Sequence, residues 1–334
     1  MHSNYERILG TLTGCAIGDA MGMPSEMWSQ QRIRRTFGRI TQFLPGPADN
    51  EISGGFAPGE TTDDSIVTVL VAKALIRSGG ELSPMDLVNS IQNWAASNPK
   101  SKTVIGPSTQ RAFQQIANGV PPELAGKNGE TNGASMRISP VGIISTTRDL
   151  PTLVRRVANV CMSTHNTSSA IAAACAVAAA VAHGIDGEED AFLRDVILEA
   201  ATLGEKQGFE TCSPSVVERI CFSLDLSDSI DDDEEFMRRQ YALVGCGLPS
   251  TESVPTALTI ALRCGVDLMR CARLCANIGG DTDTMGAIAC AICGAHGGLQ
   301  TVPAEVVDQL LTVNHFDFPA LAQQLSDLRN QMLN

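Results

Sequence analysis

Residues 170–182 read AIAAACAVAAAVA and form the longest apolar stretch of the 334-residue chain. A membrane-spanning helix needs roughly 18 or more apolar residues, so this stretch is too short to cross a bilayer. A helix that is apolar on every side lies instead inside a protein core. The stretch therefore predicts a central helix around which a soluble protein, not associated with a membrane, is packed.

Outside this stretch, apolar residues recur at helical spacing through most of the chain, and clean two-residue alternation is nearly absent. Gly265 is expected to divide one such region into two short helices. The prolines expected at helix boundaries are Pro84, Pro107, Pro121, Pro122, Pro140, Pro151, Pro214, Pro255, Pro303 and Pro319. The apolar stripes comprise Ile66, Val67, Leu70, Ala74 and Leu75, then Leu153, Val154, Val157 and Val160, then Ile260, Leu268, Leu274 and Ile278. We expect a single all-α domain spanning residues 1–334, with about a dozen or more helices.

Composition favours the same fold. Aromatic residues make up only 4% of the chain, so small and aliphatic side chains must fill the core, as closely packed helices allow. The formal net charge is −13, without a Lys/Arg cluster, which predicts that nucleic acid is not a partner. An anionic ligand would need local donors or metal ions in such a protein.

Eleven cysteines are present, and several lie inside apolar helical runs, as Cys175, Cys290 and Cys293 do. The Cys290–Cys293 spacing occurs in redox and metal motifs, but no second pair or histidine follows at zinc-site spacing, so core packing is favoured. Abundant reduced thiols indicate the cytoplasm. The N-terminus lacks a basic region and contains Asp19, so no signal peptide is expected.

Three segments depart from the helical pattern. Residues 38–62 and 119–137 are rich in Gly, Pro and Asn and are expected to be long loops, which in a compact domain are usually functional. The acidic run at residues 231–235 is interpreted as a solvated helix N-terminus, where carboxylates complement the helix dipole.

Two helix starts share an unusual design. Residues 62–65 (TDDS) precede the helix IVTVLVAKAL, and residues 279–284 (GGDTDT) precede MGAIACAICGA. One acid in a first turn is explained as a cap, but two crowded carboxylates repel each other unless a cation lies between them. All the candidate ligands are oxygens, which favours Mg²⁺, Mn²⁺ or Ca²⁺ over zinc or copper. Two such groups from distant parts of the chain can close around a pair of ions.

Four motifs, in order, resemble those of the ADP-ribosylglycohydrolases, including the bacterial dinitrogenase-reductase-activating glycohydrolases. Residues 14–26 (GCAIGDAMGMPSE) are similar to the N-terminal segment, residues 62–64 to the first metal motif, residues 132–137 (NGASMR) to the substrate loop, and residues 280–284 to the second metal motif. The resemblance implies a compact orthogonal bundle of helices.

The resemblance also implies roles for individual residues. Two Mg²⁺ or Mn²⁺ ions would be held by Thr62, Asp63, Asp64, Asp281, Asp283 and Thr284. Glu26 would be catalytic or gating, and Asp64 or Asp283 would accept a proton from water. Substrate would contact Asn132, Gly133, Ser135, Met136 and His165. Arg137 is expected to brace an acid or bind phosphate, with bracing favoured, and Asp19 to brace the loops under the site. His183, His296 and His315 are interpreted as structural.

The sequence departs from the family pattern at the nucleotide end. Leu248 stands where an aromatic residue is expected, and residues 127–137 contain none. The predicted activity is metal-dependent cleavage of a glycosidic bond at ribose, most simply removal of ADP-ribose from a protein or small conjugate. Two alternatives remain: hydrolysis of a smaller riboside, such as a nucleoside, and a non-catalytic metal-containing binding protein. The sequence leaves the oligomeric state undetermined.

Overall fold

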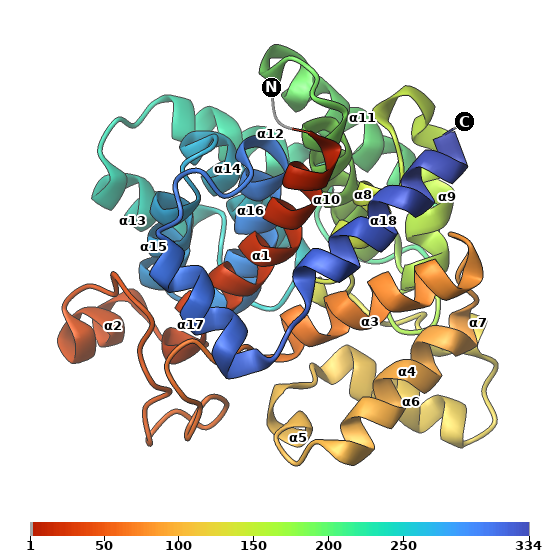
Figure 1. Cartoon of the computed structure of the whole chain (residues 1–334), viewed down its shortest axis with the longest axis horizontal. Coiled ribbons are helices and arrows are strands. Elements are labelled where there is room, and N and C mark those ends of the chain that lie inside the picture. Colours follow the sequence, from red (N-terminus) through yellow and green to blue (C-terminus); the bar gives the residue numbers. More distant parts are fainter. Residues whose placement is uncertain (1–2, 334) are drawn as a thin grey trace.

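The computed structural model describes residues 3–333 (Figure 1), which form helices joined by loops, with three isolated β-bridges and no longer strand. The predicted all-α fold is confirmed. The α-helices are α1 (Asn4–Gly22), α2 (Gln30–Phe37), α3 (Asp63–Ser78), α4 (Pro84–Ser97), α5 (Ser101–Val104), α6 (Pro107–Ala117), α7 (Pro122–Ala125), α8 (Ser139–Ile143), α9 (Leu150–Cys161), α10 (Ser168–Asp186), α11 (Leu193–Gly204), α12 (Val216–Asp228), α13 (Asp233–Leu243), α14 (Ser250–Cys264), α15 (Leu268–Ile278), α16 (Thr282–Gly297), α17 (Ala304–Asn314) and α18 (Phe318–Leu333). The 3-10 turns are η1 (Met23–Ser25), η2 (Asn132–Ala134), η3 (Thr147–Asp149) and η4 (Asp190–Phe192).

Helix α10 is the predicted central helix, and every residue from Ser169 to Ile185 is buried. Thr167 caps its N-terminus, and Gly187, in the left-handed conformation, ends it. Helices α8, α9, α11, α14 and α16 pack around it. At 19 residues it is longer than the apolar run, and of the helices in residues 3–333 it alone has the length and hydropathy of a membrane span. Because 94% of the most hydrophobic 18-residue stretch of α10 is buried inside the protein, α10 has the environment of a core helix.

Helices α1 and α16 lie side by side and position the candidate site (Figure 1). Their backbones touch: a Cβ atom on Gly18 would lie 1.9 Å from the carbonyl oxygen of Gly286, and one on Gly22 would lie 2.3 Å from that of Thr282. Only glycine permits such an approach. The pairing therefore sets the first turn of α16 beside the last turns of α1, where Asp19 lies.

The expected helix boundaries agree with the structure except at Pro255, where the prediction was wrong. The other prolines precede a helix or occupy its first turn, and Gly265 separates α14 from α15. Pro255 lies inside α14 and cannot donate to the carbonyl oxygen of Thr251. The Nε atom of Arg219 donates to that oxygen instead, at 3.1 Å, which satisfies the group that proline leaves unpaired.

Of the two predicted loops, residues 38–62 form one throughout. Residues 119–137 were expected to be a loop but include α7 and η2, because Pro122 favours a first helical turn at α7. The acidic run does begin a helix: the Asp232 side chain accepts a hydrogen bond from the N–H of Glu235 at the start of α13.

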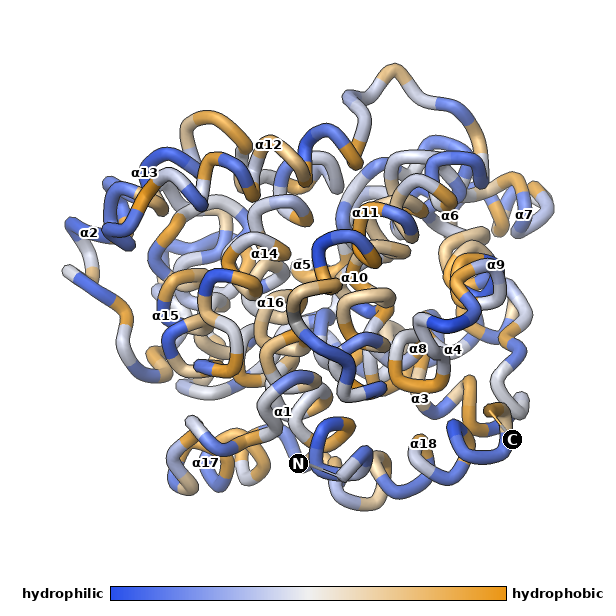
Figure 2. The backbone as a smooth tube through the Cα atoms, turned by 90° about the horizontal axis from the view of Figure 1, so that it is seen from above, coloured by the Kyte–Doolittle hydropathy of each residue, from blue (hydrophilic) through white to orange (hydrophobic). Residues whose placement is uncertain are grey.

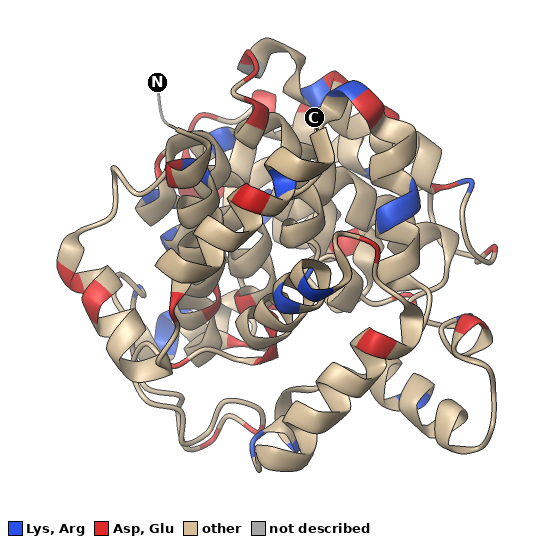
Figure 3. Ribbon diagram, turned by 45° about the vertical axis from the view of Figure 1, so that its right-hand side comes forward, with Lys and Arg blue, Asp and Glu red and all other residues tan. Residues whose placement is uncertain are grey.

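Polar character is concentrated on the outer helices. In Figure 2 the segments labelled α2 and α13 are largely hydrophilic. Figure 3 shows Lys and Arg distributed over several elements and interspersed with Asp and Glu, without a continuous basic stripe in that view. One large hydrophobic cluster of buried residues underlies this surface.

Candidate functional site

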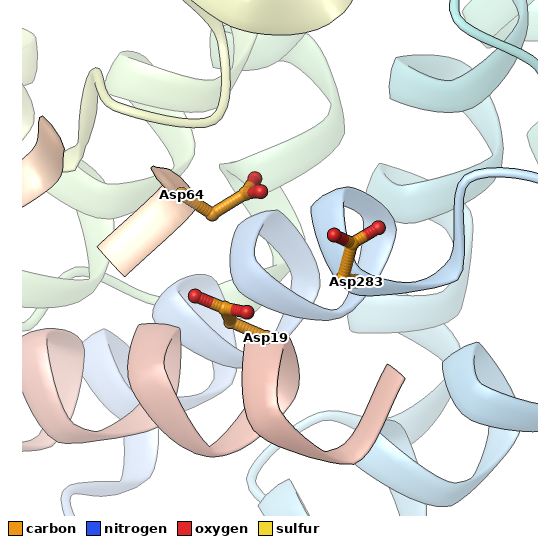
Figure 4. Close-up of side chains that lie close together, drawn as sticks. All are labelled: Asp19, Asp64 and Asp283. Atoms are coloured by element: carbon orange, nitrogen blue, oxygen red, sulfur yellow. The ribbon is translucent and has the colours of Figure 1, made fainter. Parts of the chain in front are cut away.

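The two acidic helix starts meet beside α1. Carboxylate oxygens of Asp19, Asp64 and Asp283 lie within 4.8 Å of one another (Figure 4), and so do those of Glu26, Asp281 and Asp283. Asp283 belongs to both groups, so they form one continuous cluster. The residues come from the end of α1, the position directly after η1 (Glu26), the start of α3 and the start of α16; the α3 and α16 positions are far apart in the sequence.

Asp19 braces the start of α3, as expected. Its carboxylate accepts hydrogen bonds from the backbone N–H and the hydroxyl of Thr62, at 2.9 and 3.0 Å. It also accepts bonds from the N–H and the hydroxyl of Ser65, at 3.0 and 2.5 Å. Burial raises the pKa of Asp19 to about 6, against the lowering effect of these bonds. The sequence did not predict that the Asp19 carboxylate also lies close enough to those of Asp64 and Asp283 to bind the same cation.

The cluster carries more negative charge than its hydrogen bonds can compensate. Burial, followed by the neighbouring carboxylates, holds the pKa values of Glu26, Asp63, Asp64 and Asp283 well above their usual range. Within residues 3–333, buried oxygens of three of these side chains have no hydrogen-bond partner, namely Glu26 Oε2, Asp64 Oδ1 and Asp283 Oδ1. Buried carboxylates without donors require protons or cations.

The Thr62 hydroxyl contacts three carboxylates but has too few hydrogens to satisfy them all. Its oxygen lies 3.0 Å from Asp19 Oδ1, 3.0 Å from Asp64 Oδ2 and 3.3 Å from Asp283 Oδ2. A hydroxyl has one hydrogen and can donate to only one of the three carboxylates. The contacts of the Thr62 oxygen with the other two carboxylates then have no hydrogen between the oxygens, and they are repulsive when all the acids are ionised. An oxygen-only donor set of this kind suits a hard divalent cation.

Asn132 connects the predicted substrate loop to the second metal motif. Its Nδ2 atom donates to Asp281 Oδ2 at 2.5 Å and to Ser253 Oγ at 2.9 Å. Its backbone N–H donates to the carbonyl oxygen of Leu248 at 2.9 Å. Both amide hydrogens of Asn132 are therefore directed at protein groups, and the residue orients Asp281.

A backbone bridge places Glu26 at the cluster. Met27 donates from its N–H to the Gly280 carbonyl at 2.7 Å, and Gly280 donates to the Trp28 carbonyl at 2.8 Å. Gly280 has a φ of 81°, and a Cβ there would lie 2.1 Å from the carbonyl oxygen of Cys246. The Gly280 position thus tolerates no side chain, and it ties the Glu26 loop to the start of α16.

A cavity of about 420 Å³ opens over the cluster. Its lining comprises Glu26, Asp63, Asp64, Val104, Gly106, Pro107, Thr109, Thr131, Asn132, Gly133, Met136, His165, Leu248, Asp281, Asp283 and Thr284. Of the expected site residues, only Thr62 and Ser135 lie outside this lining. Thr62 lies against Asp19, and the buried Ser135 hydroxyl has no hydrogen-bond partner in the described part of the chain.

Sequence reasoning missed part of the cavity wall. Thr131 and the residues of α5 and α6 line it but carry no motif, and no local sequence signal identifies them. No Phe, Tyr or Trp is among the described residues that line the cavity, in agreement with the departure noted at Leu248.

The structure corrects the role expected for Arg137. It is buried and, among the described residues, forms no ion pair with an acid; its Nη2 atom donates to Thr164 Oγ1 at 2.7 Å and to the Val160 carbonyl at 3.4 Å. It braces the segment that leads into His165. Burial holds the pKa of the His165 imidazole well below its usual range.

Nine of the eleven cysteines are buried, in agreement with core packing, whereas Cys212 is exposed and Cys221 half-buried. All eleven are free thiols, and Cys290 and Cys293 are buried in α16. The thiols of Cys290 and Cys293 lie 3.9 Å from the Leu268 carbonyl oxygen and 3.8 Å from that of Ala261.

Comparison with known proteins gives consistent matches along the whole chain. A family model described as ADP-ribosylglycohydrolase matches residues 1–333. The chain is 38% identical to the uncharacterized protein YegU of Escherichia coli (strain K12), covering 98% of each, and 25% identical to the ADP-ribosylhydrolase ARH3 of Mus musculus, covering 90% of this chain and 86% of that protein. A solved structure titled ADP-ribosylglycohydrolase-related protein complex superposes with a TM-score of 0.71 at 23% identity, covering 98% of this chain and 100% of the other. That structural likeness concerns the fold.

Proposed function

Because the chain belongs to the ADP-ribosylglycohydrolase family, we propose that it removes ADP-ribose from a protein side chain or a small conjugate, in a reaction that requires two divalent cations, Mg²⁺ or Mn²⁺. The family consists of glycosidases that cleave ADP-ribose linkages, so the predictions of this family and of an enzyme are confirmed. The leaving group, the ions and a cytoplasmic location are part of the proposal, and the free thiols support that location.

The observation that carries the proposal is the buried carboxylate cluster at the floor of the cavity. The groups that would hold the cations are Thr62, Asp63, Asp64, Asp281, Asp283 and Thr284. Among the described residues, Asp64 and Asp283 each have a buried oxygen without a hydrogen-bond partner, and their raised pKa values fit cation ligands better than structural caps. When bound, such cations supply Lewis acidity that polarises oxygens of the substrate and of water.

The protein's own groups supply orientation and proton transfer. Asn132 fixes the carboxylate of Asp281, and Asp19 fixes Thr62, so the ligand geometry is preorganised. Glu26 belongs to neither metal motif but lines the cavity beside Asp283. In the proposed reaction, Glu26 takes a proton from the attacking water or gives one to the leaving group at the anomeric carbon.

A second candidate is hydrolysis of a smaller riboside. The apolar side chains of the cavity wall are Val104, Pro107, Met136 and Leu248, and among the described lining residues there is no Phe, Tyr or Trp to stack on a base. Base stacking contributes about 1–3 kcal/mol where it occurs, so its absence reduces the expected affinity for adenine.

The test is a panel of ADP-ribosyl-arginine, ADP-ribosyl-serine, O-acetyl-ADP-ribose and common nucleosides, incubated with the protein and Mg²⁺ or Mn²⁺. Release of ADP-ribose that stops with EDTA and returns with the metal is the expected result. The Glu26→Gln variant should bind metal normally but lose most turnover. Cleavage of nucleosides alone would support the second candidate. Binding of these ligands without turnover under any metal condition would instead identify a non-catalytic binding protein.

A further inference from the structure

Arg137 carries a buried charge that the proposed reaction does not use. Its side chain is about 1% exposed, and it meets a hydroxyl and a carbonyl rather than a carboxylate. Burial lowers its pKa to about 10, so the guanidinium remains positive at neutral pH. A buried charge is retained at considerable cost unless its hydrogen bonds satisfy it. A series of hydrogen-bonded side chains connects this charge to the cavity.

The chain of hydrogen bonds runs from Arg137 to the cavity wall. Arg137 Nη2 donates to Thr164 Oγ1 at 2.7 Å, and Thr164 Oγ1 lies 2.8 Å from His165 Nδ1. On the other side of the ring, His165 Nε2 lies 3.0 Å from Thr131 Oγ1. Thr164 and His165 are buried, whereas Thr131 is half-buried and lines the cavity.

The number of hydrogens on each group determines which group donates and which accepts in this series of hydrogen bonds. The guanidinium can only donate, so Thr164 Oγ1 accepts from Arg137, and its own hydrogen needs an acceptor. His165 Nδ1 is the acceptor in contact with it, because no other is recorded for this hydroxyl among the described residues. The neutral imidazole then carries its hydrogen on Nε2 and donates to Thr131 Oγ1. The hydroxyl hydrogen of Thr131 is left to point away from the ring.

Close packing keeps the imidazole in this arrangement. A Cβ on Gly133 would lie 3.0 Å from both Cε1 and Nε2 of His165, so the ring rests against the bare backbone there. Thr131 is held by a backbone bridge to Pro249. The ring has little freedom to turn, and the Thr131 side chain is presented at a fixed place on the wall.

We propose that Thr131 binds a phosphate oxygen of the substrate, and that Arg137, Thr164 and His165 are positioning residues that direct its hydroxyl hydrogen into the cavity. The inference rests on the proposed function, which supplies a substrate bearing phosphate. It gives a ligand role to a residue outside the family-like motifs.

The distribution of charge selects the ligand group. The cavity floor is lined by carboxylates, which repel an anionic group, so an anion must bind on the side that offers donors. A hydrogen-bonded chain that begins at a cation is polarised along its length, and its terminal hydroxyl becomes a stronger donor. Such a donor favours a charged acceptor, and hydrogen bonds to charged groups are stronger than those to neutral ones.

Binding measurements on Thr131 variants test the ligand role. With saturating Mg²⁺, titration calorimetry would compare ADP-ribose, ribose 5-phosphate and ribose. Thr131→Val, which keeps the shape but removes the hydroxyl, should weaken the two phosphorylated ligands about tenfold and leave ribose unchanged. Thr131→Ser keeps the hydroxyl and should restore binding. Equal weakening of all three ligands, or none in the valine variant, would overturn the ligand role.

The tautomer of His165 tests the direction of the chain. Nitrogen NMR of the ligand-free protein should find the hydrogen on Nε2, and Thr164→Val should shift the population toward Nδ1 and weaken phosphate binding without changing Mg²⁺ affinity. A hydrogen on Nδ1 in the wild type would overturn the relay. Wild-type protein that binds neither phosphorylated ligand would overturn the proposed function as well, whereas normal wild-type binding with an unaffected Thr131→Val variant would overturn only this inference.

Discussion

The carboxylate cluster should make the cation-free protein more stable as the solution is acidified from neutrality. The folded-state pKa values of these acids are raised, so their stabilising effect is fully present below their unfolded values and is lost as pH rises through the folded ones. In EDTA, lowering the pH from about 7 to about 5.5 should therefore increase the free energy of unfolding. Ordinary acid destabilisation has the opposite sign.

Asp19 sets a minimum size for this effect. Its pKa rises from 3.8 to about 6, which corresponds to roughly 3 kcal/mol between full protonation and full ionisation. About 0.8 kcal/mol of that is recovered by about pH 5.5. The pKa values of Glu26, Asp63, Asp64 and Asp283 are also held well above their usual range by burial, so these acids add to the gain in the same pH window.

His165 opposes the gain in stability on acidification, and comparison with a variant that retains His165 cancels its contribution. Its pKa is lowered by burial, so the stability that it contributes is present above its unfolded value and is lost as pH falls. Asp283→Asn leaves His165 intact but removes one carboxylate shared by both groups. The variant should be as stable as the wild type or more stable in EDTA at neutral pH, and it should gain less on acidification.

Urea unfolding followed by circular dichroism measures these differences across the pH range. With saturating Mg²⁺ the acid gain should disappear or reverse, because protons then compete with the bound cations. If wild type and Asp283→Asn lose stability in parallel between about pH 7 and about pH 5.5 in EDTA, the electrostatic reasoning is wrong.

Three other predictions concern packing and specificity. Gly18→Ala should cost several kcal/mol or prevent folding, because its Cβ would lie 1.9 Å from the Gly286 carbonyl oxygen, whereas Gly106→Ala meets open space and should change the melting temperature little. Cys290→Ala should lower the free energy of unfolding by about 1 kcal/mol and leave turnover unchanged; lost turnover at unchanged stability would contradict the packing role. Leu248→Tyr should tighten ADP-ribose binding about tenfold relative to ribose 5-phosphate if this wall faces the base, and an unchanged ratio in calorimetry would place the base elsewhere.

The features that could be predicted from sequence are those written in local signals. The start of α3 at Asp63 follows from capping by Thr62, and the buried α10 follows from an apolar run. Helix α16 begins after Asp281, a residue type that favours helix starts, although its side chain forms no capping hydrogen bond among the described residues. The meeting of the α3 and α16 starts in one site could not be predicted from capping, because capping residues do not indicate which part of the fold packs against a helix start. The crowded carboxylates at both helix starts already suggested a shared cation site, and the order of the four family-like motifs strengthened that prediction.

The features that could not be predicted depend on contacts distant in sequence. Pro255 inside α14 is tolerated because Arg219, on α12, donates to the carbonyl that proline leaves unpaired. Arg137 is the last residue of the substrate-loop motif, and only the fold shows that it faces Thr164 rather than an acid. The side of the cavity that contains Thr131 is formed by loops and short helices, whose patterns are too brief to identify.

The charge of the site explains why these features occur together. The carboxylates of Asp19, Glu26, Asp63, Asp64, Asp281 and Asp283 would carry six negative charges if all were ionised. The N-termini of α3 and α16 together offer about one positive charge through their dipoles. Two divalent cations, as proposed, leave about one negative charge uncompensated. Arg137, whose pKa the negative charge of Asp63 raises against the effect of burial, supplies the remaining positive charge. On this reasoning the buried guanidinium has two effects: it balances the charge of the site when the cations are bound, and through Thr164 and His165 it polarises the Thr131 hydroxyl at the cavity wall.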